Sequence, residues 1–164
     1  MSPKVALLMG SKSDLPKLEK TIETLKKLDI PHVVRVMSAH RTPSVVQEFA
    51  ENAEDNGFEV ILAAAGGAAH LAGVVAAHTL LPVVGIPVQG GALNGLDALL
   101  ATVQMPGGIA VATVGIGSGG ATNAALIAGQ ILARQDSEVR SRLAAYRAER
   151  REQVIEADGE VSSL

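Results

Sequence analysis

A histidine and an arginine stand side by side in this sequence, at His40 and Arg41. An apolar run before them predicts a strand, and the amphipathic residues after Pro43 predict a helix. Thr42 followed by Pro43 is typical of a helix start, because the hydroxyl can cap and the ring tolerates the first helical position. An imidazole and a permanent cation in a strand-to-helix turn indicate proton transfer on an anionic substrate. The alternative from position alone is a histidine that bonds its own loop beside a surface cation.

A second turn whose residues could bind a ligand is Gly10–Asp14, which also follows an apolar run. Gly10 permits a tight turn, and the hydroxyls of Ser11 and Ser13 can face an anion together with backbone N–H groups at a helix start. Asp14 can cap the helix or bind sugar hydroxyls. Taken alone, the turn favours plain N-capping by Ser13 or Asp14. It matches neither a Walker loop nor the dinucleotide fingerprint.

A third turn pairs Gly66 and Gly67 with His70 and Leu71. Paired glycines allow a ligand to approach the backbone closely, with amide groups directed at it. We expect His70 in the first turn of the following helix. A histidine there is interpreted as one that shapes the pocket without moving protons, in preference to a second catalytic group.

The elements between these turns alternate in type. Strands are expected at Lys4–Met9, Pro31–Met37, Glu59–Ala65, Pro82–Val88 and Ile109–Val114. Helices are expected at Leu15–Leu28, Pro43 to about Asn56, Ala68 or Ala69 to Thr79, Ala121–Arg134 and 137–156, with a frayed tail at 157–164. This alternation predicts one domain over 1–164, a flavodoxin-like three-layer α/β/α sandwich with a central parallel sheet. The three turns then share the carboxyl edge, where ligands bind.

Composition excludes several classes of protein. The 14 Lys and Arg against 17 Asp and Glu give a net charge of −3, and aromatic residues are few, so nucleic-acid binding is not expected. The absence of Cys excludes thiolate catalysis and Cys-based metal sites and fits a reducing compartment. The N-terminus has no signal-peptide pattern, so we expect a cytoplasmic protein.

The charge is distributed unevenly. Between Glu59 and Arg134, Asp97 is the only Asp, Glu, Lys or Arg. Glycines and prolines interrupt this stretch too often for a membrane-spanning helix of about 20 apolar residues. We therefore expect a homo-oligomer whose contacts bury the central and later segments. The alternative is a monomer with an uncharged surface rich in Ala and Gly.

Six segments resemble the signature segments of the class I N5-carboxyaminoimidazole ribonucleotide mutase family, also called the phosphoribosylaminoimidazole carboxylase catalytic subunit family. They are Met9–Asp14, Ser38–Pro43, Ala65–Leu71, Leu81–Gln89, Val103–Pro106 and Asn123–Leu126, and the resemblance spans roughly residues 4–150. The sequence departs from the usual pattern at Ala72, where Pro is common, and at Gly90-Gly91, where a Ser-containing pair is usual. These departures concern loop stiffness and packing.

The resemblance implies an isomerase of purine (IMP) biosynthesis that moves a carboxylate from the exocyclic nitrogen of an aminoimidazole ribonucleotide to ring carbon C4 through trapped CO2. It implies His40 as the general acid and base. The implied substrate-binding residues are Ser11, Ser13, Asp14, Ser38, Ala39, Arg41, Gly66, Gly67, His70 and Leu71. Arg41 suits the 5′-phosphate, Asp14 suits ribose hydroxyls, and Gly66 to Leu71 matches a lid. The resemblance implies no cofactor, no metal, and a homo-octamer with sites between subunits. No membrane partner is expected, because glycines and prolines interrupt the apolar stretch.

Two other functions stay open at this point. A class II carboxylase, which uses free CO2 and the unmodified nucleotide, shares the fold and the histidine, although the stretch from Gln89 to Pro106 favours class I. A non-catalytic flavin- or nucleotide-binding module is compatible with a phosphate-binding turn on a doubly wound sheet. That module does not explain His40 beside Arg41, and the chain has almost no aromatic residues to stack on a flavin.

Overall fold

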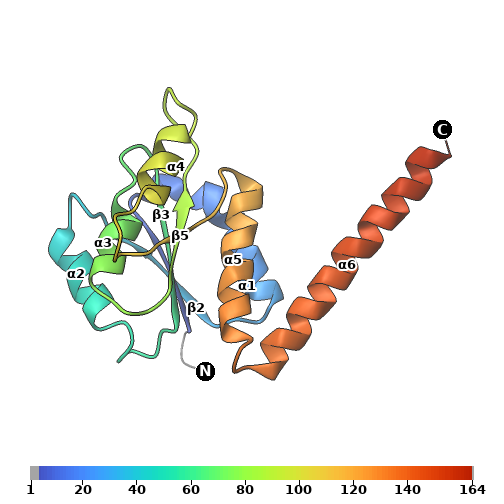
Figure 1. Ribbon diagram of the computed structural model, residues 1–164, viewed down its shortest axis with the longest axis horizontal. Coiled ribbons are helices and arrows are strands. Elements are labelled where there is room, and N and C mark those ends of the chain that lie inside the picture. Colours follow the sequence, from blue (N-terminus) through green and yellow to red (C-terminus); the bar gives the residue numbers. More distant parts are fainter. Residues whose placement is uncertain (1–3, 164) are drawn as a thin grey trace.

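The computed structural model describes residues 4–163, which form a five-stranded parallel sheet between two layers of helices (Figure 1). The strands are β1 (Val5–Met9), β2 (His32–Val36), β3 (Val60–Ala65), β4 (Val83–Pro87) and β5 (Ala112–Thr113). The helices are the 3-10 helix η1 (Lys12–Leu18), α1 (Glu19–Lys27), α2 (Pro43–Glu51), α3 (Leu71–Ala77), α4 (Leu96–Val103), α5 (Ser118–Leu132) and α6 (Ser137–Ser162). The predicted flavodoxin-like three-layer α/β/α fold is confirmed.

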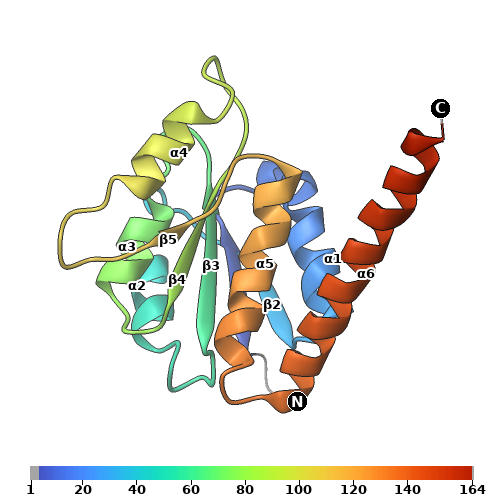
Figure 2. The ribbon, with the colours of Figure 1, turned by 45° about the vertical axis from the view of Figure 1, so that its right-hand side comes forward.

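Alternate strand residues pack against opposite helical layers, as the twofold side-chain period requires. In β1, Leu7 and Met9 belong to the core cluster shared with α1 and α5, whereas Ala6 and Leu8 belong to the cluster shared with α2 and α3. Figures 1 and 2 show α2, α3 and α4 on one side of the sheet and α1 and α5 on the other. Because β1 is buried on both faces, its sequence is continuously apolar.

The strand order β2-β1-β3-β4-β5 places β1 between β2 and β3. Met9 at the end of β1 pairs with Val36 of β2 and with Ala64 of β3. The chain moves toward one edge of the sheet after β1 and toward the other edge after β3. Such a reversal opens a crevice at the carboxyl ends of the strands, and ligands of open α/β sheets bind there.

Two elements differ from the sequence-based expectation on this edge. The helix expected from Leu15 begins instead as η1, because Pro16 has no N–H to continue an α-helical ladder and α1 forms only after it. The helix α4 was not predicted at all. It begins after Gly95, whose φ of 94° is left-handed, and glycines of this kind indicate a turn rather than a helix when only the sequence is available.

The C-terminal helix is longer than expected. It continues to Ser162, so the predicted end at 156 and the frayed tail at 157–164 are wrong for residues 157–162, and Leu164 lies outside the described residues. A single Gly159 inside a helix costs only about 1 kcal/mol relative to Ala and does not end it.

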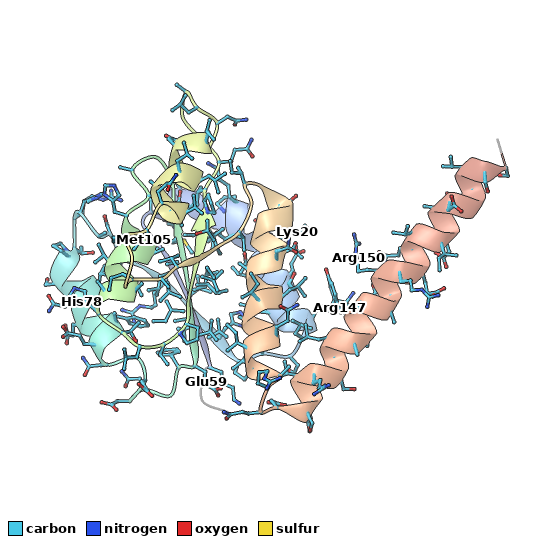
Figure 3. All side chains as sticks on the ribbon, in the orientation of Figure 1. Lys20, Glu59, His78, Met105, Arg147 and Arg150 are labelled. Atoms are coloured by element: carbon cyan, nitrogen blue, oxygen red, sulfur yellow. The ribbon has the colours of Figure 1, made fainter. Side chains whose placement is uncertain are left out.

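Only the first half of α6 packs on the domain. Val139 and Leu143 are buried, and the Nζ atom of Lys27 in α1 lies 2.6 Å from a carboxylate oxygen of Glu149. Beyond that contact the helix extends away from the sheet (Figure 2). Figure 3 shows Arg147 and Arg150 on the side of α6 that faces the domain. Although α6 has 26 residues, no helix within residues 4–163 is apolar enough over sufficient length to cross a membrane.

We expect Gly120→Ala to destabilise the protein strongly. A Cβ atom at Gly120 would overlap the carbonyl oxygen of Gly115, so the backbone that places the start of α5 would have to move. Overpacking of this kind costs about 3 kcal/mol, measured as the free energy of unfolding in urea. Gly119→Ala is the matched control, because nothing lies within 4 Å of its Cβ position, and it should be neutral or slightly stabilising. Equal stability of the two variants would contradict this account.

Candidate active site

A cleft of about 620 Å³ lies at the carboxyl edge of the sheet. Ten of the eleven predicted site residues line it, namely Ser11, Asp14, Ser38, Ala39, His40, Arg41, Gly66, Gly67, His70 and Leu71. Ser13 is not part of the lining, but its hydroxyl lies 2.8 Å from that of Ser11. The structure therefore brings the three predicted turns together in one place.

Side-chain hydroxyl groups of the turn that carries His40 and Arg41 form hydrogen bonds with the backbone of the same turn. The Ser38 hydroxyl accepts hydrogen bonds from the backbone N–H of Arg41 at 3.2 Å and from the backbone N–H of His40 at 3.4 Å. The Thr42 hydroxyl accepts from the backbone N–H of Ser38 at 2.9 Å and makes no capping bond to α2. The predicted capping role of Thr42 is therefore wrong, because its hydroxyl closes the turn instead.

Arg41 links this turn to the one after β1. Its Nη2 donates to the carbonyl oxygen of Gly10 at 2.6 Å, and its Nε donates to the Ser38 hydroxyl at 3.4 Å. In the first turn Ser11 is the N-cap of η1, and its hydroxyl accepts from the backbone N–H of Ser13 at 3.3 Å. Capping thus falls to Ser11 rather than to Ser13 or Asp14, and the Asp14 carboxylate is one of the groups that line the cleft.

The Asp14 carboxylate is electrostatically costly where it lies. Partial burial raises its pKa above the ordinary value of 3.8, while Lys17, a backbone hydrogen bond from Ser11 and Arg41 act in the opposite direction. A carboxylate with part of its hydration removed gains from a hydrogen-bond donor supplied by a ligand. Sugar hydroxyls are donors of this kind.

His40 and His70 contact each other across the cleft. The Nε2 atom of His40 lies 2.7 Å from Nδ1 of His70, and the rings are nearly perpendicular at 87°. His70 is the N-cap residue of α3, so the contact joins the second turn to the third. A hydrogen bond at this distance holds one proton between the two nitrogens, whereas protonation of both atoms would set two N–H groups against each other. The contact therefore fixes the His40 ring relative to the third turn.

The third turn runs beside the residue that follows β4. The carbonyl of Ala65 accepts from the backbone N–H of Val88 at 2.9 Å, and a Cβ at Gly66 would lie 3.4 Å from the Val88 carbonyl oxygen. Gly67 has a φ of 60°, a conformation that favours glycine. Both glycines are exposed on the cleft side, so their backbone is accessible to a ligand.

A fourth turn spans residues 89–95, and its Gln89, Gly90 and Gly91 also line the cleft, although they were not predicted as site residues from the sequence. Its Gln89 side chain donates to the Asn94 side-chain oxygen at 2.8 Å, and the backbone N–H of Gly95 donates to the carbonyl of Gly90 at 3.1 Å. The signal was available, because this turn follows a predicted strand of the same parallel sheet. Within residues 4–163, no group of three or more His, Asp or Glu side chains is arranged to hold a metal ion.

Asp97, at the start of α4, is a further cleft residue that sequence reasoning did not assign. Its carboxylate accepts from the backbone N–H of Ala98 at 3.0 Å. Its isolation in the charge-poor stretch was the available signal. An acidic side chain in the first turn is also favourable to the helix, so the position alone does not assign a function.

Comparison with known proteins identifies the family. A family model described as AIR carboxylase matches residues 4–153. The chain belongs to the AIR carboxylase family. The N5-carboxyaminoimidazole ribonucleotide mutase of Escherichia coli K12 is 53% identical over 153 residues, which cover 93% of this chain and 90% of the relative. The mutase of Bacillus subtilis 168 is 47% identical over 161 residues, which cover 98% and 99%.

Solved structures agree with this family membership. The crystal structure of Treponema denticola PurE2-S38D superposes with a TM-score of 0.88 at 28% identity and covers 98% of both chains. Treponema denticola PurE gives a TM-score of 0.86 at 29% identity and covers 96% of this chain and 98% of its own. The family recognised from the sequence motifs is therefore confirmed, as is the fold.

We expect Asp14→Asn to raise stability at pH 7 while it weakens ligand binding. The pKa of Asp14 in the folded state lies above the ordinary value of 3.8. Between these two pKa values the native state binds more protons than the unfolded state, so wild-type stability falls as pH rises through this interval. The neutral amide removes that cost. The advantage of Asp14→Asn in urea midpoint should be present at pH 7 and shrink as pH falls toward 3.8.

Asp136→Asn is the control of opposite sign. Asp136 caps α6, and hydrogen bonds from the backbone N–H groups of Val139 and Glu138, with a contribution from Lys4, lower its pKa below 3.8. Its stabilising effect is present above 3.8 and is lost as pH falls through the lowered folded-state pKa. The same pH series should therefore show Asp136→Asn as the less stable variant at pH 7. An Asp14→Asn variant that is no more stable than wild type at pH 7 would refute the assignment of burial as the cause at Asp14.

Proposed function

We propose that this protein is a 5-(carboxyamino)imidazole ribonucleotide mutase, which reversibly moves the carboxylate from the exocyclic nitrogen to ring C4. The product is 4-carboxy-5-aminoimidazole ribonucleotide, an intermediate of purine (IMP) biosynthesis. One observation carries the proposal: His40 and Arg41 share a cleft with the Ser11–Asp14 turn in a member of the AIR carboxylase family. Relatives of 47 and 53% identity that bear the mutase name support the choice of reaction.

In this proposal the first two turns bind the ribose phosphate. Arg41 takes the 5′-phosphate, since Gly10 and Ser38 already hold its guanidinium in place and a fixed fork suits phosphate oxygens. The Ser11 hydroxyl assists, and Ser13 acts only through Ser11. Asp14 accepts hydrogen bonds from the ribose hydroxyls.

The base then lies between Ser38-Ala39 on one side and the loop from Gly66 to Leu71 on the other. His40 gives a proton to the exocyclic nitrogen as the bond from nitrogen to the carboxyl carbon breaks, which releases CO2. Ring C4 attacks the CO2, and the same imidazole removes the C4 proton and returns to its starting state. The contact with His70 orients the His40 ring during both transfers. Proton and carboxylate are each returned, so the rearrangement balances without another reactant.

We further propose that the protein assembles as a homo-octamer with its sites at subunit boundaries. Both histidines and both glycines of the cleft are exposed in a single chain, so the chain alone does not enclose CO2. An apolar stripe runs beside the cleft along α4 and the turn before it, formed by Leu93, Leu96, Leu100 and Val103 at 48 to 60% exposure. A surface of this kind is typical of contacts between subunits. A cytoplasmic location and a single domain over 1–164 remain predictions.

We expect wild type to sediment with eight chain masses and Leu100→Glu to sediment with fewer, together with a loss of most mutase activity. The buried charge would disfavour the contact. Sedimentation velocity measures the mass. Leu100→Met is the control, because it keeps an apolar side chain of similar size at the same position and should leave assembly intact. A wild-type monomer with full activity would refute the octamer.

We expect His40→Asn to fold and assemble normally while turnover falls by at least about a thousandfold. The substitution removes the titratable ring from an exposed turn whose backbone bonds come from Ser38 and Thr42. Circular dichroism and sedimentation check the fold, and conversion of the N-carboxylated nucleotide to the C4-carboxylated product is followed in both directions.

The same assay separates the two carboxylation reactions. Wild type should use the N-carboxylated nucleotide efficiently and should show little activity with aminoimidazole ribonucleotide plus dissolved CO2. Fast use of free CO2 with slow turnover of the N-carboxylated nucleotide would identify the class II reaction instead. Near-normal activity of assembled His40→Asn would refute the role of His40 in either case.

A further inference from the structure

Lys17 lines the same cleft, although a regular helical period would place it on the solvent face. It belongs to η1, a 3-10 helix, in which residues three apart lie one above the other. Lys17 therefore stands over Asp14, and its charge is the largest single influence that opposes the raised pKa of that carboxyl. The ammonium group is directed to the ligand side of the turn by the local helix type.

The ammonium of Lys17 also reaches the fourth turn. Its Nζ donates to the carbonyl oxygen of Gln89, across 72 positions of the sequence. A Cβ at Gly90 would lie 3.4 Å from the same Nζ, at van der Waals contact, so the ammonium lies directly against this turn. Lys17 thus bridges the turn proposed to bind the ribose and the turn before α4.

The charge of Lys17 determines the net formal charge of the cleft. Apart from the histidines, the charged side chains that line the cleft are Lys17, Arg41, Asp14 and Asp97. With Lys17 the formal charges cancel, and without it they sum to −1. The proposed substrate carries both a phosphate and a carboxylate, which a net negative cleft would repel.

We propose that Lys17 is a further substrate-binding residue, whose ammonium pairs with the 5′-phosphate of the nucleotide opposite Arg41. This inference rests on the proposed function. Asp14, assigned to the ribose, lies directly beneath Lys17, so the phosphate attached to that ribose comes within reach of the ammonium. Before substrate binds, the carbonyl of Gln89 holds the ammonium at the cleft. The residue binds substrate and takes no part in proton transfer.

The test compares Lys17→Met with Lys26→Met, a matched loss of charge at an exposed residue of α1 that does not line the cleft. At low salt we expect Lys17→Met to raise the Kd of the product nucleotide about tenfold and KM by a similar factor, with kcat within about twofold. Lys26→Met should match wild type. Lys17→Arg should recover most of the affinity, and the salt dependence of binding should be weaker in Lys17→Met than in wild type.

The nucleoside that lacks the phosphate is the second probe. Its affinity should be nearly the same in wild type and Lys17→Met, because the lost contact is with phosphate. An equal loss for nucleoside and nucleotide, or no loss for either, would overturn the proposal. Circular dichroism and sedimentation verify the fold, and Lys17→Gln replaces Lys17→Met if the apolar side chain impairs assembly. Failure of wild type to convert the N-carboxylated nucleotide would refute the mutase function, whereas the nucleotide titrations would still decide the role of Lys17.

Discussion

The site depends on the parallel pairing of β1 with both of its neighbours. Met9 lies opposite Val36 on one side and Ala64 on the other, so the three strands end within one residue of each other. Because side chains alternate along a strand, a slip of one residue would also exchange the two faces of the buried β1, and the core therefore specifies the register. Residues far apart in sequence meet at the cleft as a consequence of how the core packs.

The turns then hold one another. Arg41 donates to the carbonyl of Gly10, His40 contacts His70, and Lys17 donates to the carbonyl of Gln89, so each contact joins two different turns. None of these three bonds lies within a helix or strand. The scaffold brings the turns near, and polar side chains set their relative positions, which is the arrangement that preorganised sites require.

Most of the fold followed from the sequence because its signals are local. Apolar runs gave the buried strands, and Thr42-Pro43 gave the start of α2 to the residue. The helix α4 was not predicted because its first residue follows Gly95, and the residues before it, which include Gly90, Gly91 and Asn94, are typical of a turn. The end of α6 was placed too early, since exposed polar residues carry little information on where a helix frays.

The sequence predicted which turns form the site, but it did not predict the hydrogen bonds within and between those turns. Strand-to-helix turns of one parallel sheet must share an edge, and this rule placed His40, Asp14 and Gly66 together correctly. Local sequence did not reveal that Thr42 closes its own turn or that Ser11 is the cap. Lys17 was not predicted as a site residue, because a period of 3.6 residues per turn does not place it over Asp14, whereas the 3-10 helix has three residues per turn.

The exposure of the reacting groups sets a kinetic requirement on the proposed chemistry. A released gas molecule can either be recaptured by the ring carbon or diffuse into bulk water, and the two fates compete in every catalytic cycle. In a cleft this open the yield of carboxylated product depends on residence time as much as on the rate of proton transfer. The fraction of CO2 that is recaptured therefore depends on the groups that enclose the carboxyl edge of the sheet. The side chains that carry out the bond changes do not determine this fraction alone.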